Sequence, residues 1–95
     1  MAQSSNSSNG RRSALELTQL AKESVEALTG FPPESVSGLE HEDDKWRVEV
    51  DVLELERVPS TTDVIATYVV ELDERGELLG YRRARRFVRG AAEEG

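Results

Sequence analysis

The feature that most constrains the fold is the segment from Lys45 to Arg89, in which strand-like runs are separated by two turn signals. Its first part alternates apolar and charged residues, which is typical of a strand with one buried face. The apolar members are Trp46, Val48, Val50 and Val52. At Leu53 the alternation slips, which indicates a bulge or a section buried on both faces. The segment therefore predicts a β-sheet rather than a helical fold.

Two further strands follow in the same segment. The run from Val64 to Asp73 again alternates, and it leads into a turn of sequence Asp-Glu-Arg-Gly. Gly76 closes that turn because it adopts positive φ without a steric penalty. The final strand is expected from Glu77 to Arg89, after a connection at 57–62 that contains Pro59. Short turns between such strands predict an antiparallel meander.

The register of the last hairpin has two solutions. In one, Val70 faces Gly80; in the other, a shift by one residue sets Val70 against Tyr81 and Val64 against Phe87. The second buries more apolar surface, and a bulge at Gly80 would convert one register into the other. The sequence leaves this choice open.

An amphipathic helix precedes the sheet. Ser13-Ala14-Leu15-Glu16 matches a capping box, in which side chains satisfy the first backbone N–H groups of a helix. Apolar residues then recur at helical spacing for about four turns. They are Leu17, Leu20, Ala21, Val25 and Leu28. Gly30 ends the helix in the left-handed conformation, and the two prolines after Phe31 prevent its continuation.

One small domain accounts for the whole chain. A chain of 95 residues is too short for two cores. Residues 1–12 are expected to be a disordered tail, 13–89 the domain and 90–95 a flexible C-terminal tail. Residues 34–42 predict a short strand before a polar turn at His41–Asp44. The predicted fold class is α+β: one N-terminal amphipathic helix packed on a three- to four-stranded antiparallel β-meander.

Composition limits the cellular compartments in which this protein is expected. The chain contains 0 cysteines, which excludes a disulfide-stapled secreted scaffold and a thiolate metal site. No apolar run approaches the roughly 18 residues needed to span a bilayer, and the N-terminus lacks the apolar core of a signal peptide. We expect a soluble cytoplasmic protein.

The candidates for catalysis and for cofactor or metal binding are weak. His41 lies among four acidic residues, but no second His and no Cys exists to complete a transition-metal site. The same histidine has no positioned nucleophile and no orienting acid, as a hydrolytic triad requires. Alternating Glu and Asp on a strand normally mark its solvated face. We therefore predict no enzyme activity, no catalytic residues, no cofactor and no metal.

The predicted strand GYRRARRFVRG is the most distinctive chemical feature of the chain, because it concentrates arginines. Residues 75–89 carry a net charge of +5, whereas residues 34–74 carry −10. Arginine suits phosphate, and Tyr81 and Phe87 suit base stacking, so a nucleic-acid surface is one candidate. The acidic neighbouring strands would repel a polyanion or pair with the same arginines, which disfavours nucleic acid. Cross-strand ion pairs are the first interpretation, and binding to an acidic protein partner the second.

The segment from Trp46 onward resembles the gas vesicle protein O family. The resemblance depends on the order and spacing of several short pieces rather than on one motif. These are Trp46, the run Glu54-Leu55-Glu56-Arg57 with Pro59, then Asp63, Tyr68, Leu72-Asp73 with Gly76, and Tyr81 with Arg82, Arg86 and Arg89. Phe87 departs from the tyrosine expected beside the preceding arginine.

The resemblance implies an accessory protein of gas vesicle assembly that acts without enzymatic chemistry, by binding other gas vesicle proteins, in the cytoplasm or on the vesicle. We assign the contact with partners to Tyr81, Arg82, Arg86 and Arg89, because charge complementarity steers association without promoting aggregation. The alternatives are a nucleic-acid-binding module and a small inhibitor or sensor domain. The client protein, the stoichiometry and the oligomeric state stay open.

Overall fold

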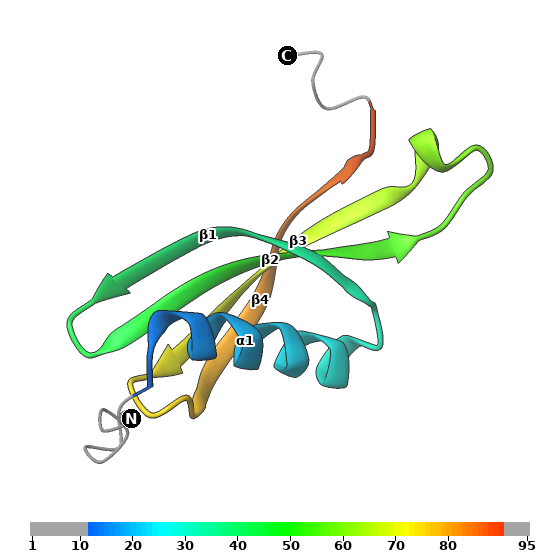
Figure 1. Cartoon of the computed structure of the whole chain (residues 1–95). Helices are drawn as coiled ribbons and strands as arrows, with labels where there is room; N and C mark the ends of the chain where they lie inside the picture. The colour runs from blue at the N-terminus through cyan, green and yellow to red at the C-terminus, as the bar shows by residue number, and fades with distance from the viewer. Residues whose placement is uncertain (1–11, 91–95) are drawn as a thin grey trace.

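The structure, a computed structural model, describes residues 12–90 as one helix followed by a four-stranded antiparallel sheet (Figure 1). The elements are α1 (Ala14–Thr29), β1 (Pro33–Glu42), β2 (Lys45–Leu55), β3 (Val64–Asp73) and β4 (Leu78–Val88). The strands lie in the order β1-β2-β3-β4, so each pairs with its neighbour in sequence. The predicted α+β class is confirmed, and the meander has four strands.

Both ends of α1 follow from the sequence. Ser13 Oγ accepts a hydrogen bond from the Glu16 N–H at 3.1 Å, and the Glu16 carboxylate accepts one from the Ser13 N–H at 3.0 Å. This is the predicted capping box. Gly30 ends the helix at φ +81°, and its N–H donates to the Glu26 carbonyl.

The main core lies between α1 and one face of the sheet (Figure 1). Leu17, Ala21 and Val25 are spaced four residues apart, so they share one stripe of the helix, and all three are buried. The sheet contributes every second residue of its two central strands. These are Val48, Val50 and Val52 from β2, and Ala66, Tyr68, Val70 and Leu72 from β3.

The opposite face of the sheet, called the open face below, has no helix against it in the described part of the chain. Even so, β3 is buried on both sides: on the open face Ile65, Thr67 and Val69 are at most 5% exposed. They are shielded by the longer side chains of β2 and β4 that flank them in the register. A nearly continuous apolar strand is therefore found at the centre of the sheet.

The last hairpin uses both registers that the sequence left open. The Asp73 N–H donates to the Glu77 carbonyl, and then a bulge at Leu79 shifts the pairing so that Val70 faces Tyr81. A second bulge at Ala84 shifts it again.

Neither register extends to the start of β3: the pairing of Val64 with Phe87, which belongs to the second register, does not form, since Val64 pairs with Val88. The physical reason is the second bulge, which adds one residue to β4 but none to β3. The slip predicted at Leu53 is present one residue farther, because the β2–β3 register shifts between Leu53 and Leu55.

One end of the sheet extends beyond α1 (Figure 1). This projecting end comprises residues 53–65 and 86–90, and it includes a 3-10 helix at Ser60–Thr62 and a cis peptide bond before Pro59. The main core cluster does not reach Val64 or Ile65. The projecting end must therefore be held by other contacts.

The predicted tails fall almost entirely at 1–11 and 91–95, outside the described residues. Arg12, which the prediction placed in the N-terminal tail, contacts the β3–β4 turn. Its backbone N–H donates to the Glu74 carbonyl at 3.0 Å, and its Nε donates to the Arg75 carbonyl at 2.9 Å.

Candidate functional site

The sequence Arg-Arg-Ala-Arg-Arg in β4 divides its arginines between the two faces of the sheet. In a regular strand residues 82 and 86 would share one face, because side chains alternate with a period of two. The bulge at Ala84 breaks that period. As a result Arg83 and Arg86 lie on the α1 side, opposite Tyr68 and Ala66, whereas Arg82 and Arg85 lie on the open face.

The two arginines on the α1 side share one carboxylate. Arg83 Nη1 donates to Glu54 Oε2 at 3.0 Å, and Arg86 Nε donates to Glu54 Oε1 at 2.6 Å. The Glu54 side chain is only 11% exposed, while the two arginine side chains are about half exposed. Glu54 occupies the β2 bulge, which places it between both guanidinium groups. One positive charge remains unneutralised in this group.

Apolar side chains continue the same row of β4. Leu78 and Tyr81 lie on the α1 side, yet they are 41% and 43% exposed because the helix packs mainly on the other three strands. The Tyr81 ring lies 6.2 Å from the Tyr68 ring, in a tilted arrangement. Leu78, Tyr81, Arg83, Arg86 and Val88 form what we call the α1-side row.

The arginines on the open face have no acidic partner among residues 12–90. Arg82 makes no ion pair or side-chain hydrogen bond there, and it lines a shallow recess with Val69 and Glu71. The Arg85 guanidinium lies 5.9 Å above the Phe87 ring, a cation–π contact. Both side chains are therefore available to an outside partner.

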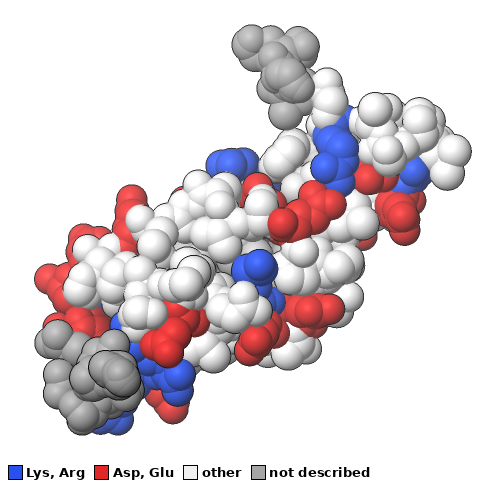
Figure 2. Space-filling model, in the orientation of Figure 1, with Lys and Arg blue, Asp and Glu red and all other residues white. Residues whose placement is uncertain are grey.

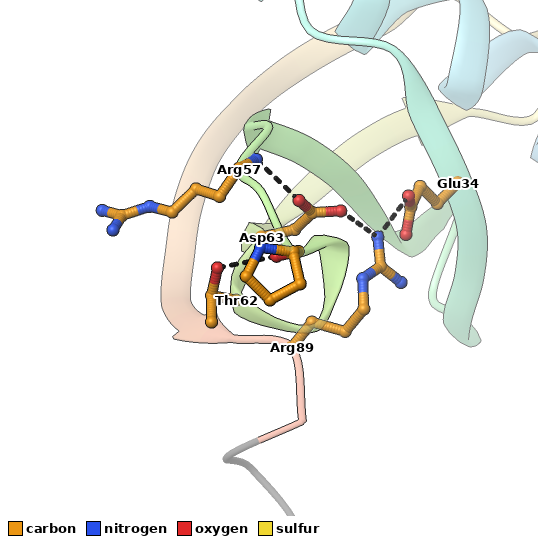
Figure 3. A network of polar contacts seen from close by, with 6 residues as sticks. Glu34, Arg57, Thr62, Asp63 and Arg89 are labelled. Carbon is orange, nitrogen blue, oxygen red and sulfur yellow. Dashed lines mark hydrogen bonds and ion pairs between the residues drawn. The ribbon is translucent and has the colours of Figure 1, made fainter.

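The Arg89 side chain links the end of β4 to the start of β1 and to the residue before β3 (Figure 3). Its Nη2 donates to Glu34 at 2.7 Å and to Asp63 at 3.3 Å. Asp63 is buried and also accepts a hydrogen bond from the Arg57 N–H at 2.8 Å. The hydrogen bond to Glu34, with a smaller contribution from Asp63, raises the pKa of Arg89 above its ordinary value. This geometry gives Arg89 a structural role in the projecting end.

The acidic end of the molecule carries a different cluster, and Figure 2 shows red side chains gathered where the β1–β2 turn lies. The His41 ring stacks on Trp46 at 4.2 Å, and His41 Nε2 lies 3.0 Å from Glu74 Oε2. Arg47 Nη1 donates a hydrogen bond to Glu40 Oε1 at 2.9 Å, and this hydrogen bond raises the pKa of Arg47. Within residues 12–90 no group of three or more His, Cys, Asp or Glu side chains is arranged to hold a metal ion.

The four residues predicted to contact partners do not share one surface. Tyr81 and Arg86 lie in the α1-side row, Arg82 lies on the open face, and Arg89 belongs to the network around Asp63. Their role in binding stays a prediction. The prediction omitted Arg83 and Arg85, since no residue pattern marks Ala84 as the bulge that sorts the arginines.

Comparison with known proteins gives the family. The profile described as "Gas vesicle synthesis protein GvpO" matches residues 1–93, so the chain belongs to this family of gas vesicle synthesis proteins. The chain is similar to gas vesicle protein O of Streptomyces sp. (strain CB03234), with 54% identity over 66 residues. It is also similar to gas vesicle protein O1 of Halobacterium salinarum and gas vesicle protein O of Haloferax mediterranei, with 35% and 33% identity. The resemblance predicted from the sequence is confirmed.

The matched regions cover 70% to 78% of this chain. They cover 52%, 62% and 54% of the three relatives, so the chain spans little more than half the length of the proteins it matches. No solved structure matches the chain. None of the helices in residues 12–90 has the length and apolar character needed to cross a membrane.

Proposed function

We propose that this protein is an accessory factor of gas vesicle assembly that acts without enzymatic chemistry, by binding other gas vesicle proteins in the cytoplasm or on the vesicle. Membership of the gas vesicle synthesis family supports the process. The exposed α1-side row of β4 is the observation that carries the binding role.

The α1-side row combines side chains that favour protein recognition. Tyrosine and arginine are enriched among residues that dominate binding energy, and exposed leucine and valine supply apolar area beside them. Arg83 and Arg86 are oriented by Glu54 and remain about half exposed, so their other N–H groups are available to a partner. Pre-oriented arginines lose less conformational entropy when a partner binds.

The non-enzymatic part of the proposal rests on how the polar groups are used. In the described surface the recess beside Arg57 and Val88 is open to solvent. The charged groups of the projecting end bind one another across strands and loops. Such an arrangement suits a rigid binding module.

A matched pair of variants tests the binding surface. Leu78→Ser combined with Tyr81→Ser removes apolar contacts from the α1-side row, and Leu39→Ser removes an equally exposed leucine from β1, at the other edge of the sheet. We expect the first variant to lose capture of other gas vesicle proteins in cells that express the gas vesicle genes, and Leu39→Ser to retain it. Equal capture by both folded variants would contradict the proposed surface.

A further inference from the structure

The centre of the open face carries an acidic row on β2 and a basic row on β4, and the charged residues of the two rows lie at the same positions along the strand direction. Glu49 on β2 and Arg82 on β4 flank Val69, because both pair with it across the sheet. One step along the strands, Asp51 and Arg85 flank Thr67 in the same way. An acidic row and a basic row therefore run parallel, about 9–10 Å apart, on either side of β3.

These charges do not neutralise one another within the chain. Arg82, Arg85 and Glu49 form no ion pair among residues 12–90. Asp51 Oδ1 accepts hydrogen bonds from Thr67 Oγ1 at 2.6 Å and Ser37 Oγ at 3.2 Å, which are hydroxyl groups without charge.

We propose that a second copy of this chain packs against the open face, forming a symmetric dimer. A two-fold axis along the direction of β3 turns one sheet onto the other and exchanges the β2 side with the β4 side. The acidic row of one copy then lies over the basic row of the other. An axis across the strands would instead place acid over acid, so charge selects the first arrangement.

The register of the sheet fixes the contacts in this dimer. Glu49 and Arg82 lie at the same position along the strands as Val69, with which both pair. Arg82 of one copy therefore meets Glu49 of the other. Arg85 likewise meets Asp51, at the height of Thr67. The symmetry produces each pair twice. Leu53 and Phe87, half-buried beside Ile65, would be covered by the second copy.

The overlap between the two faces approaches the extent that a stable dimer needs. About β3 as the axis, the three strands β2, β3 and β4 of each copy overlap, and at about ten residues each they measure about 33 by 14 Å, or about 460 Å² in projection. Side-chain relief adds to that area, and standard interfaces bury about 800 Å² per partner. Packing of two sheets face to face is also a common way to cover an open sheet.

Two other modes of association fit less well. An acidic polypeptide drawn to Arg82 and Arg85 would also meet Glu49 and Asp51 on the same face, and these would repel it. Strand addition at the free edge of β4 is opposed by the bulges at Leu79 and Ala84, which interrupt the hydrogen-bonding edge.

Charge reversal on the full chain tests the dimer by sedimentation velocity. We expect the wild type to be a reversible dimer. Arg82→Glu and Glu49→Arg should each weaken dimerisation about tenfold or more, because each variant creates two repulsive pairs. An equimolar mixture of the two should recover most of the wild-type affinity, since the mixed dimer contains one original and one reversed glutamate–arginine pair and no repulsive pair. Arg75→Glu, the same charge change in the β3–β4 turn, should leave the dimer unchanged.

Three outcomes would overturn the inference: a wild type that stays monomeric at all accessible concentrations, unchanged dimerisation of both variants, or a mixture of folded variants that does not recover. Circular dichroism establishes folding, and Arg85→Glu provides a second probe should either variant lose its structure. The inference is independent of the proposed client surface, because Leu78 and Tyr81 lie on the other side of the sheet.

Discussion

The region of the sheet beneath α1 and the projecting end are stabilised by different interactions. Beneath α1, fully buried apolar side chains such as Leu17, Val50 and Val70 meet across two layers. The projecting end has no second layer in the described residues, and arginine–carboxylate contacts around Glu54 and Asp63 hold its strands and loop together. The first region is therefore expected to set global stability, and the second to open locally.

The largest effect is expected from the core beneath α1. Leu17→Ala removes a fully buried side chain and leaves a cavity, which costs about 2–5 kcal/mol. For a domain of this size that loss approaches the whole free energy of unfolding. Chemical denaturation measures it, with Leu15→Ala as control because Leu15 is 80% exposed and should change stability by less than about 0.5 kcal/mol. Similar losses in the two variants would contradict the packing of α1.

A local effect is expected at Asp63. Asp63→Ala leaves the Arg57 N–H without an acceptor and removes one of the two carboxylates that the Arg89 guanidinium contacts, which costs about 1–3 kcal/mol. Hydrogen exchange should show faster exchange at the Arg57 and Arg89 amides than in the wild type, with little change at Val50 and Val70.

Asp63→Asn keeps an oxygen for the Arg57 N–H and should restore part of the protection. If Asp63→Ala instead accelerated exchange equally at Val50 and Arg57, the two regions would form one cooperative unit, and the projecting end would not open locally.

A smaller effect is expected at Glu54. Glu54→Gln removes the charge that Arg83 and Arg86 share, and the half-exposed arginines limit the cost to about 1 kcal/mol or less. Salt screens such pairs, so the difference between wild type and variant should shrink as salt increases. Denaturation in low and high salt measures this, with Glu56→Gln as control because Glu56 is exposed and forms no ion pair within residues 12–90. A salt-independent difference would contradict an ionic role.

The region beneath α1 was largely predictable from the sequence. Its helix signals are local, namely the Ser13–Glu16 capping box and Gly30, and its strands alternate with a clear period. Hydrophobic periodicity reports which residues are buried, so Val48, Val50 and Val70 could be assigned to the core before the structure.

The arrangement of the β4 arginines was not predictable in the same way. It depends on a bulge at Ala84, and an extra residue in a strand leaves no periodic trace in a run of five polar and small residues. The contact of Arg89 with Glu34 joins residues 55 apart in sequence, through a loop whose shape no local motif sets. Tertiary contacts of this kind decide which charges are neutralised.

The smallest effect is expected at the β3–β4 turn, which lies at the other end of the sheet from the projecting end. Asp73 Oδ1 accepts hydrogen bonds from the Glu77 and Arg75 N–H groups, and these lower the pKa of Asp73, with Glu77 the larger cause. A lowered folded pKa adds stability above the unfolded value of about 3.9, and that stability is lost as pH falls through the folded pKa. The stability difference between wild type and Asp73→Asn should therefore be constant near neutral pH and shrink in acid. A difference that grew in acid would mean that the turn favours the protonated carboxyl, opposite to what these hydrogen bonds require.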